Sequence, residues 1–169
     1  LGKLGEILEC SPDEAKDALA RLIDRYRGFK VLKETIIPQD GKRGWFTGLD
    51  GRIVRIPGDT AGSRKHLAMS GYLQNGEAIM MKKACVLLGR QLQESSDIKD
   101  RWKIVNFVHD EWQTEVPNDV ELALRVAKIQ ADSLRLVGEE LKLKCPLAGS
   151  YWNDDHKDYT IGQNWYQTH

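Results

Sequence analysis

The stretch from Ile104 to Pro117, IVNFVHDEWQTEVP, constrains the fold of this chain most strongly. Two short runs rich in β-branched and aromatic residues flank the polar tripeptide His109-Asp110-Glu111. This pattern predicts a tight strand–turn–strand with charged residues at its tip. Because adjacent carboxylates repel each other, they stay ionised most easily beside a cation, and Mg²⁺ is usually held by one or two carboxylates completed by water and substrate phosphate. The tripeptide alone favours the plainer interpretation, a solvated acidic turn.

Composition and charge describe an ordinary globular protein with an uneven charge distribution. The 169 residues are 41% apolar and 30% charged, which fits one domain or a large piece of one, and the net charge is zero. The charged residues of segment 41–66 are mostly basic, and those of segment 94–121 are mostly acidic. A basic segment beside an acidic one suits a site that holds phosphates and metal together, or else two complementary faces of a fold.

The three cysteines, Cys10, Cys85 and Cys145, lie far apart and are odd in number. They fit neither a disulfide framework nor a zinc site, so a reducing compartment is expected. No apolar run approaches membrane-spanning length, and no signal peptide is visible. The chain starts at Leu1 rather than Met, which we interpret as a piece of something longer or a missing leader.

Helix signals dominate the first forty residues. Ser11 as the N-cap, Pro12 at the first helical position and Glu14 closing a capping box predict the start of a helix. Gly28 is expected to end that helix, and a further apolar pattern predicts another helix as far as Pro38.

Residues 44–56 predict a β-hairpin with Asp50-Gly51 as its turn, and a long helix is expected over 64–93. One largely polar stripe follows this helix at intervals of three or four residues: His66, Ser70, Gln74, Glu77 and Met81. Core contacts are expected from other faces, through Tyr72, Ile79, Met80, Val86 and Leu87. Gly71 and Gly76 inside the helix indicate the close approach of another backbone or of a nucleic acid, or simply tight helix packing.

The second half of the chain repeats the alternation of hairpin and helix. The central hairpin is expected over 103–116 and an amphipathic helix over 119–140. The tail, residues 145–169, is irregular but aromatic, and we expect it to pack down on the protein.

Four features now stand in a fixed order: a Gly-Leu-Asp-Gly-Arg hairpin, a long helix carrying Gln74, an apolar strand into Val-His-Asp-Glu, and a terminal Gly-x-Asn-Trp-x-x-x-His. This order resembles the C-terminal part of family A DNA polymerases, the DNA polymerase I type, and especially their phage branch. The resemblance covers nearly the whole chain. Its sharpest parts are Val108 to Glu111, which is similar to polymerase motif C, and the ending at Asn164-Trp165 and His169.

The resemblance implies a catalytic role for the tripeptide. Asp110 would bind the Mg²⁺ pair, which stabilises the attacking 3′-oxygen and the leaving pyrophosphate. Glu111 would support this site without necessarily binding metal. His109 would lie near the phosphate at the primer terminus.

The resemblance also implies contacts with DNA. Gln74, with His66 and Ser70 before it on the same helix, would face the minor groove, where acceptors common to all base pairs allow pairing geometry to be checked. Basic residues suit phosphate contacts, although a solvated surface explains them equally well: Arg52, Arg55, Arg64 and Lys65. His169 belongs to the terminal motif and is a further candidate DNA contact. Ser70 stands where relatives commonly carry Asn, and residues 147–160 match the family pattern poorly.

The implied fold is α+β: a polymerase palm portion whose antiparallel hairpin carries motif C and is packed by long helices. Residues 1–40 would be the last helices of the fingers, and residues 41–169 the C-terminal part of the palm. The family's other catalytic aspartate, in motif A, and its nucleotide-binding helix, motif B, have no match here. We therefore expect this chain to be inactive without an upstream polymerase portion, whether it is a truncated fragment or a natural split subunit.

The expected partners are primer–template DNA, dNTP and that upstream portion, with no membrane. The expected location is the cytosol of a bacterium or a phage-infected host. Two rival interpretations remain open. One is a palm-like module that binds DNA or a partner polymerase without chemistry, and the other is a globular domain whose acidic turn is structural. The first gives no reason for two carboxylates aimed at phosphate, and the second does not explain the order of the motifs.

Overall fold

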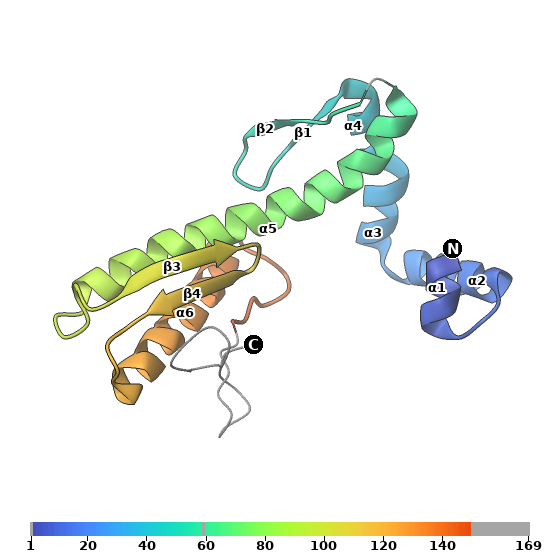
Figure 1. Cartoon of the computed structure of the whole chain (residues 1–169). Coiled ribbons are helices and arrows are strands. Elements are labelled where there is room, and N and C mark those ends of the chain that lie inside the picture. Colours follow the sequence, from blue (N-terminus) through green and yellow to red (C-terminus); the bar gives the residue numbers. More distant parts are fainter. Residues whose placement is uncertain (1, 59, 150–169) are drawn as a thin grey trace. The chain divides into compact units, whose positions relative to one another are not determined.

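The computed structural model describes residues 2–58 and 60–149, drawn in colour in Figure 1. The chain divides into two compact units, residues 1–73 and residues 74–169. Helix α5 (Ala61–Glu94) is continuous and contributes to both units. The elements are helices with two small antiparallel hairpins, which is the predicted α+β class. Across these described ranges, no helix has the length and apolar character needed to cross a membrane.

The first unit begins with α1 (Gly2–Leu8) and α2 (Pro12–Arg25). The predicted capping box is confirmed, because the Glu14 backbone N–H donates to Ser11 Oγ at 3.3 Å and the Ser11 N–H donates to the Glu14 carboxylate at 2.9 Å. These hydrogen bonds from the Ser11 backbone and side chain lower the pKa of Glu14. The box satisfies backbone donors that the first turn of a helix otherwise leaves free.

The two predicted helix ends at Gly28 and Pro38 were wrong. Helix α2 stops at Arg25 because Tyr26 takes a non-helical conformation, with φ −102° and ψ 82°, and α3 (Arg27–Val31) then starts with Gly28 inside it. A π-helical stretch, η1 (Leu32–Ile36), leads into α4 (Ile37–Arg43), which contains Pro38 in its first turn. Proline lacks an N–H, and the first turn is where no helical partner for it is needed, so the chain stays helical through this position.

Gly44, at φ +82°, ends α4, and the first hairpin follows. Strands β1 (Trp45–Thr47) and β2 (Ile53–Arg55) are antiparallel, with Phe46 opposite Val54. The turn is one residue wider than predicted. The Gly48 N–H donates to the Arg52 carbonyl at 2.8 Å, and the Gly51 N–H donates to the Gly48 carbonyl at 3.0 Å, which leaves the three-residue loop 49–51. Gly51 adopts φ +83°, the left-handed conformation that such a loop needs at its last position.

The core of the first unit joins α4, the first hairpin and the beginning of α5. Ile37, Phe46, Ile56 and Ala68 are its buried members. A Cβ placed on Gly71 would lie 3.2 Å from Phe46 Cε1, so the missing side chain makes room for this ring. Of the two explanations for a glycine at position 71, the structure therefore supports close packing within the fold.

The second unit packs the rest of α5 against a second hairpin and α6 (Val120–Glu140), as the green, yellow and orange segments of Figure 1 show. Its hairpin consists of β3 (Lys103–Val108) and β4 (Glu111–Glu115). The buried core comes from α5, the following loop and α6: Leu88, Leu92, Ile98, Leu122 and Val126. The carboxylate of Asp119 caps α6 by accepting from the Leu122 N–H at 3.1 Å, as the predicted helix start at 119 requires.

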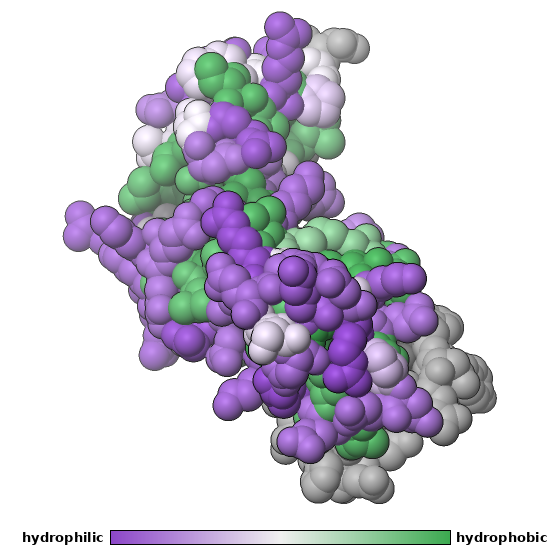
Figure 2. All heavy atoms as spheres, turned by 90° about the vertical axis from the view of Figure 1, so that its left-hand side faces the viewer, coloured by the Kyte–Doolittle hydropathy of each residue, from purple (hydrophilic) through white to green (hydrophobic). Residues whose placement is uncertain are grey.

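Hydrophobic side chains also reach the surface, interspersed with hydrophilic ones on the face seen in Figure 2. After α6 the chain returns across this helix. A Cβ on Gly149 would lie only 2.8 Å from the Cα of Ala131, so the backbones touch there. The aromatic tail from residue 150 onward lies outside the described residues, and its packing stays a prediction.

Candidate functional site

The tip of the second hairpin is a two-residue loop, His109-Asp110, closed by the pairing of Val108 with Glu111. The tripeptide pattern placed Glu111 in the loop together with His109 and Asp110. In the structure Glu111 is instead the first residue of β4. His109 has φ 50°, a left-handed conformation that costs an L-residue about 1 kcal/mol or more. Backbone strain of this kind is concentrated at functional sites, so the tip is a candidate on conformational grounds as well as chemical ones.

The two neighbouring carboxylates have different surroundings. Gln113 Nε2 donates to Glu111 Oε1 at 2.9 Å, and Asn106 Nδ2 donates to Gln113 Oε1 at 3.4 Å. This row of polar side chains holds Glu111 on the hairpin. Asp110 is exposed, and its carboxylate makes no hydrogen bond or ion pair to another described residue. Asp110 is thus the carboxylate available to an external cation.

The hairpin is anchored to the body of the second unit through β4. Gln130 Nε2 on α6 donates to Thr114 Oγ1 at 2.7 Å. Trp112 packs against the core and meets the Phe107 ring edge-on, with the ring centroids 5.9 Å apart. These contacts hold the hairpin on α6, and with it the loop that carries Asp110.

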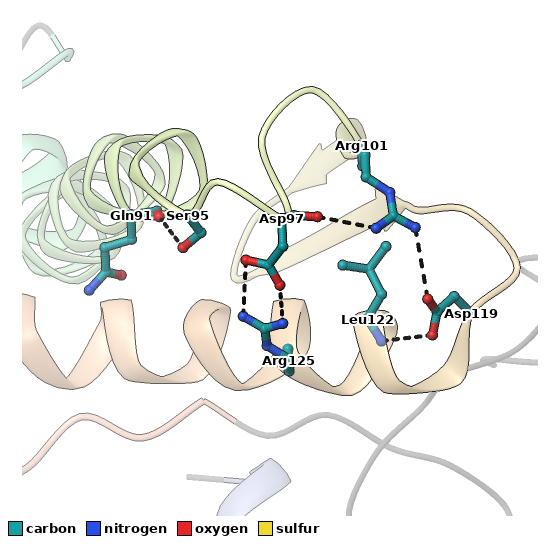
Figure 3. A network of polar contacts seen from close by, with 7 residues as sticks. All are labelled: Gln91, Ser95, Asp97, Arg101, Asp119, Leu122 and Arg125. Atoms are coloured by element: carbon teal, nitrogen blue, oxygen red, sulfur yellow. Dashed lines mark hydrogen bonds and ion pairs between the residues drawn. The ribbon is translucent and has the colours of Figure 1, made fainter.

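A polar network holds the loop between α5 and β3 on the N-terminal part of α6 (Figure 3). Arg125 pairs with the Asp97 carboxylate, and Arg101 donates to the Asp97 carbonyl at 3.1 Å. Arg101 also lies 3.8 Å from Asp119, the cap of α6. The hydrogen bond from Arg125 is the main cause of the lowered pKa of Asp97. Sequence patterns did not identify this support, because its partners are distant in the chain and each resembles an ordinary surface charge.

The candidate groove-facing residues lie on α5. Ser70 and Gln74 are exposed, as a DNA contact requires, whereas the side chain of His66 is not among those described. The stripe does not continue to Met81, which is 4% exposed although its position around the helix axis lies between those of Ser70 and Gln74. Burial at Met81 therefore depends on what covers this part of α5 and not on the spacing of the residues. Val86, expected in the core, is 55% exposed.

The candidate phosphate-binding residues differ in their contacts. Arg64 is half-buried and used within the fold, since Nε donates to the Gly41 carbonyl at 2.8 Å and Nη1 to the Gly58 carbonyl at 3.0 Å. Arg52 is exposed and pairs with Asp50 at 2.5 Å. Lys65 is exposed and has no ion pair within the described part of the chain. His169 lies outside the described residues.

The candidate residues divide between the two units of the structure. Residues 52, 64, 65, 66 and 70 belong to the first unit, and residues 74 and 109–111 belong to the second. The hairpin tip is therefore a site of the second unit, and the basic residues are a feature of the first.

Comparison with known proteins agrees with the motif order. No protein-family model matches the chain. It is 24% identical, over 177 aligned positions, to the DNA-directed DNA polymerase of Enterobacteria phage T3, an alignment that covers 91% of this chain and 24% of that protein. The corresponding polymerase of Escherichia phage T7 is 24% identical over 163 positions, covering 86% of this chain and 22% of that protein. The chain is related to the phage-type family A DNA polymerases.

A solved structure shows the same fold. The POL domain of Pol1 from M. smegmatis, in complex with DNA primer–template and dNTP, superposes with a TM-score of 0.59 at 22% identity. The match covers 77% of this chain and 24% of that chain. This chain thus spans about a quarter of the length of each protein that it matches.

The residues of this chain fit a Mg²⁺ site in part. An exposed carboxylate on a tight turn is the type of ligand that Mg²⁺ takes, usually one or two per ion with water and phosphate completing the shell. Within residues 2–58 and 60–149, however, no group of three or more His, Cys, Asp or Glu side chains could hold a metal ion. Asp110 is therefore suited to be one ligand of a site that is completed by other groups.

Proposed function

We propose that this chain supplies the C-terminal palm portion, with the last finger helices in residues 1–40, of a template-directed DNA polymerase. The reaction transfers a nucleotidyl group from a dNTP to a primer 3′-hydroxyl. The observation that carries this proposal is the exposed Asp110 on a strained two-residue loop, in a chain related to phage DNA-directed DNA polymerases. The relatives are phage proteins, so the proposed location is the cytosol of a bacterium or a phage-infected cell.

In this proposal Asp110 is a ligand of catalytic Mg²⁺. The metal would stabilise charge on the attacking and leaving oxygens of the transfer. Glu111, held by Gln113 at 2.9 Å, would add negative charge next to Asp110 without leaving its strand. His109, in the same loop, would lie against the phosphate at the primer terminus.

The remaining candidates would hold the primer–template. Exposed Ser70 and Gln74, together with His66, would face the minor groove, where hydrogen bonds to shared acceptors check pairing geometry. Arg52 and Lys65 are exposed and would contact phosphates, and His169 would contribute near the primer. Arg64 would act on DNA only indirectly, by fixing the start of α5 through its two backbone carbonyl partners.

Activity would require further polymerase residues, either attached in the same polypeptide or supplied by a second subunit. One available carboxylate does not hold two metal ions in register, and the described residues include no three-ligand metal group. The triphosphate of the dNTP would likewise be bound by that other portion.

The test is primer extension with Mg²⁺ and all four dNTPs. Three samples are compared: this chain alone, an upstream phage-type polymerase segment alone, and the two mixed. The proposal predicts extension by the mixture only. A mixture that fails to extend, with duplex binding by this chain retained, would favour the non-catalytic DNA-binding module. Loss of both extension and duplex binding would reject the polymerase role.

A further inference from the structure

Asp40 is the one charged side chain that is buried among the described residues, at 4% exposure. Its Oδ1 accepts a hydrogen bond from Arg43 Nη2 at 2.5 Å, and its Oδ2 accepts one from the hydroxyl of Tyr72. Asp40 and Arg43 lie on α4, whereas Tyr72 lies on α5. A buried carboxylate is costly unless its oxygens are paired, so this arrangement requires both helices to be in place.

Arg43 links the same carboxylate to the first hairpin. Its Nε donates to the Trp45 carbonyl at 3.1 Å, and its guanidinium carbon lies 3.5 Å from the centroid of the Trp45 ring. A cation over an aromatic face is attracted by the ring as well as by the carboxylate. Arg43 therefore joins the end of α4 to the first residue of β1.

Tyr72 completes the connection from the side of α5. Its ring stacks on that of Phe46, with the centroids 4.2 Å apart and the planes 23° apart. Phe46 is 1% exposed, and its ring also occupies the space left by Gly71. Consequently Ala68, Gly71 and Tyr72 form the face of α5 that packs on the hairpin.

Helical geometry connects this packed face to the candidate DNA contacts. Ser70 and Gln74 stand two positions before and after Tyr72 on one continuous helix, which places each about 160° around the axis from it. Both are exposed. The rotation of α5 that directs Tyr72 toward Asp40 therefore directs Ser70 and Gln74 to the opposite side.

We propose that Asp40, Arg43 and Tyr72, together the Asp40 cluster, are positioning residues that fix the rotation of α5 and so orient Ser70 and Gln74 toward the primer–template. This inference rests on the proposed function. An apolar contact tolerates sliding and rotation, whereas a buried charge with two specific donors is satisfied in one arrangement. The hydroxyl of Tyr72 is thus needed for geometry, in addition to what its ring contributes through stacking.

The test compares Tyr72→Phe, which keeps the ring, with Tyr26→Phe, which removes the hydroxyl of an exposed tyrosine. A fluorescent duplex with a matched or a mismatched primer terminus reports affinity for the full chain. We expect Tyr72→Phe to reduce the matched-to-mismatched affinity ratio about fivefold, the equivalent of one net hydrogen bond, and Tyr26→Phe to leave it unchanged. Asp40→Asn should reduce the ratio similarly, and the double variant should show no further loss because both changes break one unit.

Hydrogen exchange separates a positioning role from a structural one. Tyr72→Phe should accelerate amide exchange in α4 and in residues 68–74 while circular dichroism stays unchanged. Faster exchange with an unaltered affinity ratio would make the cluster merely structural and would overturn the proposal, as would no change in either measurement. Failure of the wild-type chain to bind either duplex would instead reject the proposed function, and with it the DNA-orienting role. The wild-type binding measurement precedes the variants, so failure of the proposed function is distinguished from failure of the positioning role.

Discussion

The hydroxyl of Tyr72 donates a hydrogen bond to the buried carboxylate of Asp40 and so joins α5 to α4. Desolvation, followed by this hydrogen bond and the charge of Asp40, raises the pKa of Tyr72 from 10.0 to about 12, although Arg43 opposes the shift. The folded protein then keeps a proton that the unfolded chain releases above pH 10. Its contribution to stability is complete below that pH and is lost as the pH rises toward about 12. Urea unfolding at pH 8 and pH 11 measures this effect. Between these pH values the free energy of unfolding should fall less for Tyr72→Phe than for Tyr26→Phe, and equal decreases would contradict this assignment.

The ion pair of Asp97 with Arg125 predicts an opposite dependence at acid pH. Hydrogen bonding by Arg125 lowers the pKa of Asp97, so the stabilisation is present above the ordinary carboxyl pKa of 3.8 and is lost as the pH falls through the lowered value. Arg125→Ala should therefore lose less stability than the wild type between pH 5 and pH 2. Arg90→Ala, an exposed change on α5, is the control and should keep the wild-type acid profile. Identical profiles for the wild type and Arg125→Ala would show that the pair is not formed in solution.

Two glycines predict opposite effects of adding a methyl group. A Cβ on Gly149 would lie 2.8 Å from Ala131 Cα and 3.1 Å from Leu134 Cδ1, so Gly149→Ala should lower the free energy of unfolding by about 1–3 kcal/mol. Gly28 lies within α3 and has nothing within 4 Å of the corresponding position. Gly28→Ala should raise the free energy of unfolding by up to about 1 kcal/mol, because alanine favours the helix. Chemical denaturation measures both, and a neutral Gly149→Ala would place the 143–149 segment elsewhere.

The left-handed conformation of His109 predicts that glycine is better tolerated than alanine at this position. Because the strain at φ 50° arises from the Cβ, His109→Gly should be about 1 kcal/mol more stable than His109→Ala. Both variants lose the imidazole and should lower primer extension in the complemented mixture, which contains this chain and the upstream polymerase segment. Denaturation midpoints of the two variants measure the first effect. A glycine variant no more stable than the alanine variant would mean that position 109 is not left-handed in solution.

The sequence predicted features that depend on neighbouring residues. The capping box of Ser11 and Glu14, the helix start at residue 119 and both hairpins follow from local donors, turn residues and alternation, and the structure contains each of them. The motif order predicted the relationship to phage polymerases without any structure. These inferences use information that lies within a few residues or in linear order.

Features that depend on distant partners could not be predicted in this way. Asp40 is separated from Tyr72 by a hairpin and the start of α5, and in the sequence it resembles any exposed aspartate. The helix ends failed for a related reason, since Pro38 is compatible with a new first turn and Gly28 with a helix interior. On the 34-residue helix α5, Met81 is buried and Val86 is exposed because burial depends on which distant segments cover each part of the helix, and the spacing of residues along the helix does not encode this.

The most direct test of the central claim is the effect of Asp110→Asn on primer extension by the complemented mixture. The substitution keeps the shape of the side chain and removes its charge, so it should reduce the rate about a hundredfold or more if Asp110 binds catalytic metal. Glu115→Gln removes an exposed carboxylate at the other end of β4 and should leave the rate unchanged. A mixture containing Asp110→Asn that extends primers at the wild-type rate would contradict the assignment of this hairpin tip as the catalytic site.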